Sequence, residues 1–448
     1  MSSVVELPPV SISNVDDGST SSIRIFQLNL NDITVELSSI GASITKVLIP
    51  NYLQKQSGAS STTRDDVVLS YASPKDQYDD KNKPFFGAIV GRVANRIKDG
   101  KFQLMQKAES TKTLETYQLE KNNYPNHLHG GYDGFCTKIW SANIVNDTEV
   151  EFMLTSPDGD CGYPAGIQVT ATYSLIHIGD DGVKLCLKMN AKLLPGETKA
   201  TPIALAQHSY FNLASHSSPN RILDHTLHLN CTKFTPFDNT SIPTREIQHV
   251  NNAMDFCKPK SLADALIQYG EERAGLDHVD AKNNVQRILN YGDASEVIAR
   301  VPKQGGVDGA NLDGGSPYGF DHNYAIDTSS EDDGLRLAAV LSHTPTGRSM
   351  RVLTSAPGMQ LYTSNYLDRK TPNPAICKGG TRYNQWQGIC LETQTYPDSI
   401  FPDDTGVDGE DEFAKGRCFI LRPGSEDYHH TVCYEFRNIL SGMRPTPR

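Results

Sequence analysis

The chain has 448 residues and a net charge of −11, from 42 Lys and Arg against 53 Asp and Glu. This length allows two domains or one large β domain, and the lack of a basic run argues against a nucleic-acid partner. Residues 1–9 lack the charged and apolar parts of an export signal, and no later run approaches the roughly 18 apolar residues of a membrane span. We therefore expect a cytoplasmic protein with no membrane partner.

The first half of the chain reads as a leader followed by strands. Residues 1–22 are rich in Ser, Asp and Pro without periodicity, which predicts a flexible N-terminal leader. From residue 23 apolar and polar residues alternate, as in half-buried strands, and the turn dipeptide Asp181-Gly182 favours a hairpin. The predicted strands are 33–37, 44–49, 150–155, 167–175 and 183–193.

The second half contains a segment of different character. Residues 258–316 are polar, charged and glycine-rich near their end, with at most one short helix capped by Ser261, so we expect an insertion outside the core. Strand patterns return at 322–326, 335–342, 351–353, 359–363 and 431–436. Many short strands with few helices predict an all-β, antiparallel sandwich that forms a single domain over residues 23–448.

The cysteines carry little functional signal. There are nine of them, an odd number, spread along the chain without C-x-x-C pairs. This spacing predicts neither a disulfide framework nor a zinc ribbon, so we expect reduced, buried thiols.

One carboxylate, Glu392, lies in an otherwise apolar, strand-like run between Gly388 and Ser399. A glutamate on a buried strand loses solvation, which raises its pKa towards the range in which a general base works near neutral pH. The alternative is a rim glutamate paired with a Lys or Arg, which is the common case for an isolated Glu.

Two polar clusters precede Glu392 in the N-terminal half. Asn95 and Arg96 can direct several hydrogen bonds to sugar hydroxyls, although a surface Arg most often pairs with a carboxylate. In the second cluster, strand alternation would send His127 and His129 to the same face, as in zinc-binding H-x-H pairs. No neighbouring motif supplies a third ligand, so we expect no metal here.

Two further clusters follow. His208 comes after an apolar strand and before a polar, aromatic turn, where a hydrogen-bonded core histidine is the ordinary interpretation. Asp321 begins a strand after Gly319-Phe320, where an aspartate often caps a turn. Each of these signals is weak alone.

Taken together and in this order, the segments 91–96, 126–131, 208–213, 320–323 and 391–394 resemble those of the aldose 1-epimerase (galactose mutarotase) family over about residues 33–436. The resemblance implies a large antiparallel β-sandwich of the galactose mutarotase-like type. It also implies an isomerase that interconverts the α and β anomers of free galactose or glucose without a cofactor or metal. We expect a monomer or weak homodimer.

The resemblance also implies roles for seven residues. Glu392 matches the general base and His208 the general acid, while the substrate-positioning groups would be Asn95, Arg96, His129, Asp321 and Gln360. The chain departs from the family pattern at Gln207, where Asn is common, and at Ile389, where an aromatic is usual. The insertion before Asp321 is longer than is typical.

Three alternatives stay open at this point. A glycoside hydrolase would use Asp321 and Glu392 as a carboxylate pair. A non-catalytic sugar-binding module would share the fold without the chemistry. A sugar-phosphate epimerase of related fold would need a basic pocket, whereas only Arg96 lies in one of these motifs.

Overall fold

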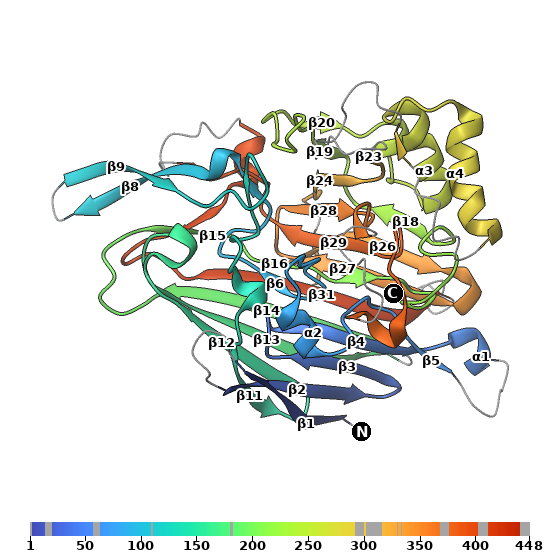
Figure 1. Ribbon diagram of the computed structural model, residues 1–448, viewed down its shortest axis with the longest axis horizontal. Coiled ribbons are helices and arrows are strands. Elements are labelled where there is room, and N and C mark those ends of the chain that lie inside the picture. The colour runs from blue at the N-terminus through green and yellow to red at the C-terminus, as the bar shows by residue number, and fades with distance from the viewer. Residues whose placement is uncertain are drawn as a thin grey trace.

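The computed structural model describes residues 2–13, 20–56, 63–108, 111–179, 182–291, 300–301, 316–328, 330–332, 334–367, 376–401 and 411–439. Three antiparallel sheets form the body (Figure 1). In spatial order, the five-stranded sheet consists of β1 (Ser2–Ser13), β2 (Thr20–Leu30), β3 (Ile33–Ser38), β4 (Ser43–Pro50) and β5 (Arg64–Asp66).

The ten-stranded sheet is the largest. Its path is β11 (Ser141–Asn146), β12 (Glu149–Ser156), β13 (Ile167–Ile178), β14 (Gly182–Leu193), β31 (Tyr428–Asn438), β27 (Arg348–Thr354), β26 (Leu335–His343), β18 (Thr226–Leu229) and β21 (Lys260–Ser261), with β25 (Ser330–Asp332) beside β26. The six-stranded sheet is β17 (Tyr210–Phe211), β29 (Ile389–Gln394), β28 (Gly358–Tyr362), β24 (Asp321–Ala325), β19 (Lys233–Thr235) and β20 (Gln248–His249).

Short pairs and helices complete the fold. The pairs are β6 (Ile89–Val90) with β16 (Ala206–Gln207), β7 (Arg96–Ile97) with β10 (His127–Leu128), β8 (Lys101–Ala108) with β9 (Thr111–Gln118), β15 (Thr201–Ile203) with β30 (Phe419–Leu421), and β22 (Arg300–Val301) with β23 (Ser316–Pro317). The α-helices are α1 (Tyr52–Gln56), α2 (Pro74–Asp79), α3 (Leu262–Glu272) and α4 (His278–Tyr291). In the part of the chain that is described, no helix has the length and apolar character needed to cross a membrane.

The predicted sandwich is confirmed, and one continuous core joins its sheets. Buried apolar residues from the five-stranded, ten-stranded and six-stranded sheets belong to the same cluster. Phe26 of β2, for example, meets Phe152 of β12 edge to face, with ring centroids 5.8 Å apart. Alternation along β12 and β13 sends every second residue into this core, as the sequence pattern predicted.

The prediction of a flexible leader over residues 1–22 was wrong for the described part of it. β1 pairs with β2 from Ser2 opposite Leu30 to Ser13 opposite Thr20, and Ile12 is buried. Arg24 also holds both carboxylate oxygens of Glu6, at 2.7 and 2.9 Å. Residues 2–13 are ordered because the edge of β2 supplies hydrogen-bond partners, which a composition-based argument does not see.

The segment 258–316 differs from the prediction in its described portion. It contains two helices rather than at most one, and α3 begins at the predicted cap, since the Ser261 side chain accepts from the Asp264 N–H. Tyr269 is buried in the main core cluster and packs against Phe320, with centroids 4.9 Å apart. The first part of the segment is therefore integral to the core, while residues 292–299 and 302–315 lie outside the described residues.

The expectation that all thiols are reduced was also wrong. Cys186 of β14 and Cys433 of β31 face each other in register and form a disulfide, whereas the other seven cysteines are free. The two residues are 247 positions apart in the chain. Only the strand pairing brings them together, which is why spacing gave no sign of it.

A buried polar network ties β18 to its neighbour β26. The His225 Nδ1–H donates to Asp224 Oδ1 (3.1 Å), and its Nε2 accepts from the Leu213 N–H (2.9 Å). His343 Nε2 lies 3.3 Å from Asp224 Oδ2. Burial would raise the pKa of Asp224, but the hydrogen bonds from the two histidines outweigh it and hold the pKa well below its ordinary value.

We expect Asp224→Asn to destabilise the fold by about 1–3 kcal/mol at neutral pH, because the amide keeps only one side-chain oxygen and one of the two buried histidines loses its acceptor. A carboxylate with a lowered folded pKa stabilises above its unfolded pKa of about 3.9, and this contribution is lost as the pH falls towards the folded pKa. Urea unfolding of wild type and variant should therefore show a difference in the free energy of unfolding that is constant above about pH 5 and shrinks below about pH 4. Asp147→Asn changes an exposed turn residue and is the control, which should unfold with the same free energy as the wild type. If Asp147→Asn and Asp224→Asn lowered that free energy equally, the pairing of Asp224 with the histidines would be refuted.

Candidate active site

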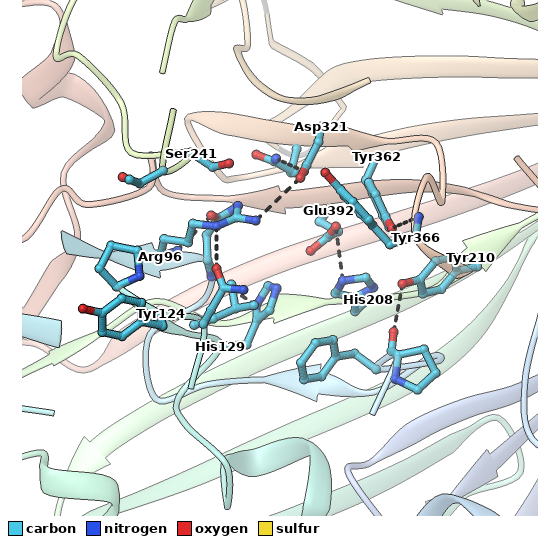
Figure 2. A pocket seen from close by; sticks show the side chains of 18 of the residues that line it. Arg96, Tyr124, His129, His208, Tyr210, Ser241, Asp321, Tyr362, Tyr366 and Glu392 are labelled. Carbon is cyan, nitrogen blue, oxygen red and sulfur yellow. Dashed lines mark hydrogen bonds and ion pairs between the residues drawn. The ribbon is translucent and has the colours of Figure 1, made fainter. Parts of the chain in front are cut away.

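Register in the six-stranded sheet brings three of the predicted residues to one face. Gln360 of β28 lies directly opposite Glu392 of β29, and Asp321 of β24 lies opposite Tyr362, two residues along from Gln360. Opposed residues in antiparallel strands share a face, as do residues two apart. Asp321, Gln360 and Glu392 therefore line the same pocket (Figure 2).

His208 enters this face from the turn between β16 and β17. Backbone hydrogen bonds fix the turn, with His208 N–H donating to the Ala88 carbonyl and Gly87 N–H donating to the His208 carbonyl, both at 2.9 Å. Its Nε2 lies 3.5 Å from Glu392 Oε1, and both side chains are almost fully buried. Figure 2 shows the two side chains pointing at each other across the pocket.

Burial changes both members of this pair. It raises the pKa of Glu392 well above its ordinary value, with a further contribution from the charge of Asp321 and a smaller opposing one from Arg96. Burial also lowers the pKa of His208 to about 3. Both shifts disfavour charge, so the two groups are suited to exchanging protons with a bound molecule.

Asp321 is held by two partners rather than left free. Its Oδ1 accepts from Gln360 Nε2 at 2.6 Å, and its Oδ2 lies 3.7 Å from Arg96 Nη2. Arg96 Nε also donates to Asn123 Oδ1 at 3.2 Å. Both Asp321 oxygens therefore have partners within the pocket.

His129 and Asn95 interlock on the opposite wall. The Asn95 N–H donates to His129 Nδ1 (3.1 Å), and the His129 N–H donates to the Asn95 carbonyl (3.1 Å). Since Nδ1 accepts, the neutral His129 ring carries its hydrogen on Nε2 and offers a donor to the pocket. Asn95 lines the pocket, but its own Oδ1 accepts from the Arg96 N–H (2.8 Å).

The predicted shared face for His127 and His129 was wrong. β10 ends at Leu128, and His129 has a φ of +51°, so strand alternation does not reach it. His127 instead lies in the core, with Nδ1 2.7 Å from the Glu120 carbonyl and Nε2 2.9 Å from the Tyr163 hydroxyl.

Sequence reasoning missed most of the pocket's rim. The cavity measures about 350 Å³. Lining residues that were not predicted include Phe85, Tyr124, Tyr210, Ser241, Tyr362 and Tyr366. Tyr210 lies opposite Cys390, two residues before Glu392, and Tyr362 lies opposite Asp321, so both tyrosines share the face of the predicted residues. Strand alternation could therefore have identified them. Tyr124, Ser241 and Tyr366 come from separate connections, for which no periodic signal exists.

Some of the chain's non-glycine residues with positive φ line the pocket that holds His208 and Glu392. Phe85, Asn95 and His129 all have positive φ, at +65°, +62° and +51°, although none is glycine. Phe85 packs against both His129 and His208, with centroids 4.9 and 5.5 Å apart. Strained residues that the surrounding structure holds in place are typical of functional sites, which supports the choice of this pocket.

Within the described ranges, two three-residue clusters have spacings that could hold a metal ion: His129 with His208 and Glu392, and Asp224 with His225 and His343. In each, one histidine accepts a backbone N–H on its other ring nitrogen, from Asn95 in the first and Leu213 in the second. A metal-bound neutral imidazole must instead donate from that nitrogen. Neither donor set therefore fits a resident metal.

We expect activity to be unchanged by a strong chelator, because the His129 tautomer presents an N–H to the pocket rather than a lone pair. Rate measurements before and after chelation and dialysis test this. Loss of activity that returns on adding zinc would contradict the assignment.

The fold and this pocket define a class of protein: a carbohydrate-handling β-sandwich with a buried acid/base pair at its open face. The aldose 1-epimerase family model matches residues 24–409. The chain therefore belongs to the aldose 1-epimerase family.

Curated relatives cover nearly the whole chain. Galactose mutarotase from Mus musculus is 32% identical over 415 residues, which are 92% of this chain and 94% of the relative. Galactose mutarotase from Sus scrofa is 33% identical with the same coverage. Aldose 1-epimerase from Escherichia coli K12 is 27% identical, over 92% of this chain and 95% of the relative.

Solved structures show the same fold. An aldose epimerase homologue from C. elegans superposes with a TM-score of 0.64 at 20% identity and covers 98% of this chain and all of its own. Galactose 1-epimerase from Lactobacillus acidophilus NCFM also superposes with a TM-score of 0.64, at 22% identity, over 98% of this chain and 99% of its own.

Proposed function

We propose that the protein is an aldose 1-epimerase that interconverts the α and β anomers of free aldohexoses such as galactose and glucose. The observation that carries this proposal is the buried pair of His208 and Glu392, 3.5 Å apart, in a pocket of positioning groups. Family membership supports the same reaction. Among the described lining residues, Arg96 is the only cation, and it is already paired with Asp321, which disfavours a sugar-phosphate substrate.

The two groups divide the proton transfers between them. Glu392 takes the proton from the C1 hydroxyl while His208 gives one to the ring oxygen, and the C1–O5 bond breaks to leave an open-chain aldehyde. Rotation about C1–C2 turns the other face of the carbonyl to the C5 hydroxyl. Ring closure reverses both transfers and gives either anomer, so no redox step or group transfer is needed.

The protein environment brings the proton affinities of Glu392 and His208 closer together. In water a carboxylate and an imidazolium differ by about two pKa units, and the proton sits on the histidine. Burial raises the pKa of Glu392 and lowers that of His208, while attraction across 3.5 Å favours the ion pair. The two placements of one proton are thereby brought closer in energy, which lowers the cost of moving it during ring opening.

Polarimetry tests the reaction directly. Freshly dissolved α-galactose or α-glucose should relax to its equilibrium rotation faster with the protein than in buffer alone. Relaxation at the buffer rate, with sugar binding intact, would favour a non-catalytic sugar-binding module on the same fold.

The pH dependence should report the shared proton. We expect kcat/KM to be flat through neutral pH, because the pair holds one proton there. It should fall in acid as the pair takes a second proton, at a pH below the ordinary histidine value of about 6.5, since burial lowers the pKa of His208. An acid limb centred at or above about 6.5 would contradict a buried, shifted histidine.

The cellular setting is also part of the proposal. We propose that the protein works in the cytoplasm as a monomer or weak homodimer, on a neutral sugar and without nucleic acid. The net charge of −11 disfavours nucleic acid, and the seven free cysteines support a reducing compartment, to which the Cys186–Cys433 disulfide is an exception. Cell fractionation and light scattering across a concentration series would test the location and the oligomeric state.

A further inference from the structure

A second polar cavity of about 290 Å³ lies apart from the active site and shares no lining residue with it. It is formed where β3, β4 and β5 meet α2 and the turn at Lys378–Gly380. The residues that line it with polar groups include Glu36, Lys46, Asp66, Ser70, His216 and Lys378. Nothing in the epimerase reaction uses them.

The four charged groups of this cavity neutralise one another. Lys378 Nζ donates to Asp66 Oδ2 at 2.6 Å and to the Val68 carbonyl at 2.8 Å. Lys46 Nζ lies 3.1 Å from Glu36 Oε2. With two carboxylates and two ammonium groups paired, the cavity has no uncompensated charge that would select an anion or a cation.

What remains is a mixture of single donors and acceptors. The Ser70 N–H donates to the Tyr383 hydroxyl oxygen (3.4 Å), so the hydroxyl proton is directed to His216 Nδ1 (3.1 Å). Burial, with a smaller effect of Lys378, lowers the pKa of His216 to about 4. The ring is then neutral at pH 7 with its hydrogen on Nε2, a donor, and the Ser70 hydroxyl can donate and accept. Glu36 Oε1 and Asp66 Oδ2 already accept from the Thr45 hydroxyl and from Lys378, and each keeps one further acceptor position.

A wall of aromatic rings separates this cavity from the active site. Tyr71 lines the second cavity and Tyr210 lines the first, and Phe86 lies between them with ring centroids 5.4 and 5.1 Å away. Tyr210 in turn stacks on His208 at 5.1 Å. The two cavities are therefore independent volumes on either side of one packed cluster.

We propose that this cavity is a second, non-catalytic binding site for a small neutral polyhydroxy compound, that is, a free sugar or an open-chain polyol. Hydroxyl groups both donate and accept, which suits a cavity with mixed partners and no net charge. The exposed Ala72, with Pro74 and the Tyr71 ring, supplies the apolar surface that the C–H face of such a compound packs against.

Binding stoichiometry tests the proposal without relying on turnover. Calorimetric titration of the full-length protein with D-galactose, and separately with D-glucitol, should reveal a second binding event. The ligand concentration should reach about 0.1 M, which is high enough to saturate a site with a Kd of about 1 mM. Ala72→Phe should abolish that event by filling the cavity while both ion pairs stay intact, and it should leave the mutarotation rate unchanged. Lys81→Phe places the same side chain on an exposed position outside the cavity and should keep both events.

A second variant guards against misfolding. Ser70→Ala removes one hydroxyl and leaves both ion pairs in place, so it should weaken the second event about three- to tenfold, as expected for one lost hydrogen bond. A single event with D-galactose in the wild-type protein, or two unchanged D-galactose events in both Ala72→Phe and Ser70→Ala, would overturn the proposal. If mutarotation were absent but the second event present and lost in Ala72→Phe, this site would stand and the proposed reaction would fall.

Discussion

Replacing Glu392 with glutamine is expected to lower kcat by about 10²- to 10⁴-fold, the usual cost of losing a general base. The amide has nearly the same shape as the carboxylate, so sugar affinity should stay close to that of the wild type. Stability should not fall, because Glu392 is buried and the change removes a carboxylate that is costly to ionise there. Polarimetric kcat and KM, with a thermal midpoint for each protein, measure all three quantities.

Glu435→Gln is the matched control for this change. Glu435 of β31 is also buried, but it pairs with Lys184, Arg351 and Arg437, at 3.1, 2.8 and 3.2 Å. Its replacement should therefore lower the thermal midpoint and leave kcat unchanged, the reverse of Glu392→Gln. Near-normal turnover in Glu392→Gln would remove that carboxylate from the mechanism.

His208→Asn is expected to lower kcat by about 10²-fold or more with little change in sugar binding, because its proton is transferred only as the ring opens. His129 offers a comparison within the same pocket, since its ring lies edge-on to that of His208 with centroids 5.3 Å apart. His129→Asn should mainly raise KM, because His129 Nε2–H is placed to donate a hydrogen bond to bound sugar throughout the reaction.

Steady-state kinetics and direct binding measurements on both variants separate the two roles. A large kcat loss in His129→Asn with intact turnover in His208→Asn would show that the acid has been assigned to the wrong histidine. Equal losses of kcat in both variants would indicate that the two rings act as one unit. The double variant would then confirm this if its loss of kcat were no larger than that of either single variant.

The sandwich was predictable because strand alternation is a local property. β12 and β13 each bury every second residue over much of their length, and this period of two is visible in the sequence before any pairing is known. The apolar side of α3 was equally visible, with Leu262, Leu266 and Tyr269 at helical spacing, but the polar composition around it concealed the signal.

Part of the site was also predictable. Glu392 is a lone carboxylate in an apolar strand, and burial of such a group needs a functional reason. That Asp321 and Gln360 join it follows from sheet register, which sequence does not supply, since a shift of one residue would turn each side chain to the opposite face.

The sequence by itself determined the fold class through local pattern, and motif order singled out Glu392 and the residues proposed to act with it. Only the tertiary structure decided that β1 is ordered, that Cys186 meets Cys433, and that His127 does not share the face of His129 but lies in the core. The second cavity is also a product of the tertiary structure alone, because its lining comes from chain segments as distant as Glu36 and Lys378. Contacts of this kind depend on long-range pairing and on single backbone angles, such as the positive φ of His129, and neither leaves a periodic trace in the chain.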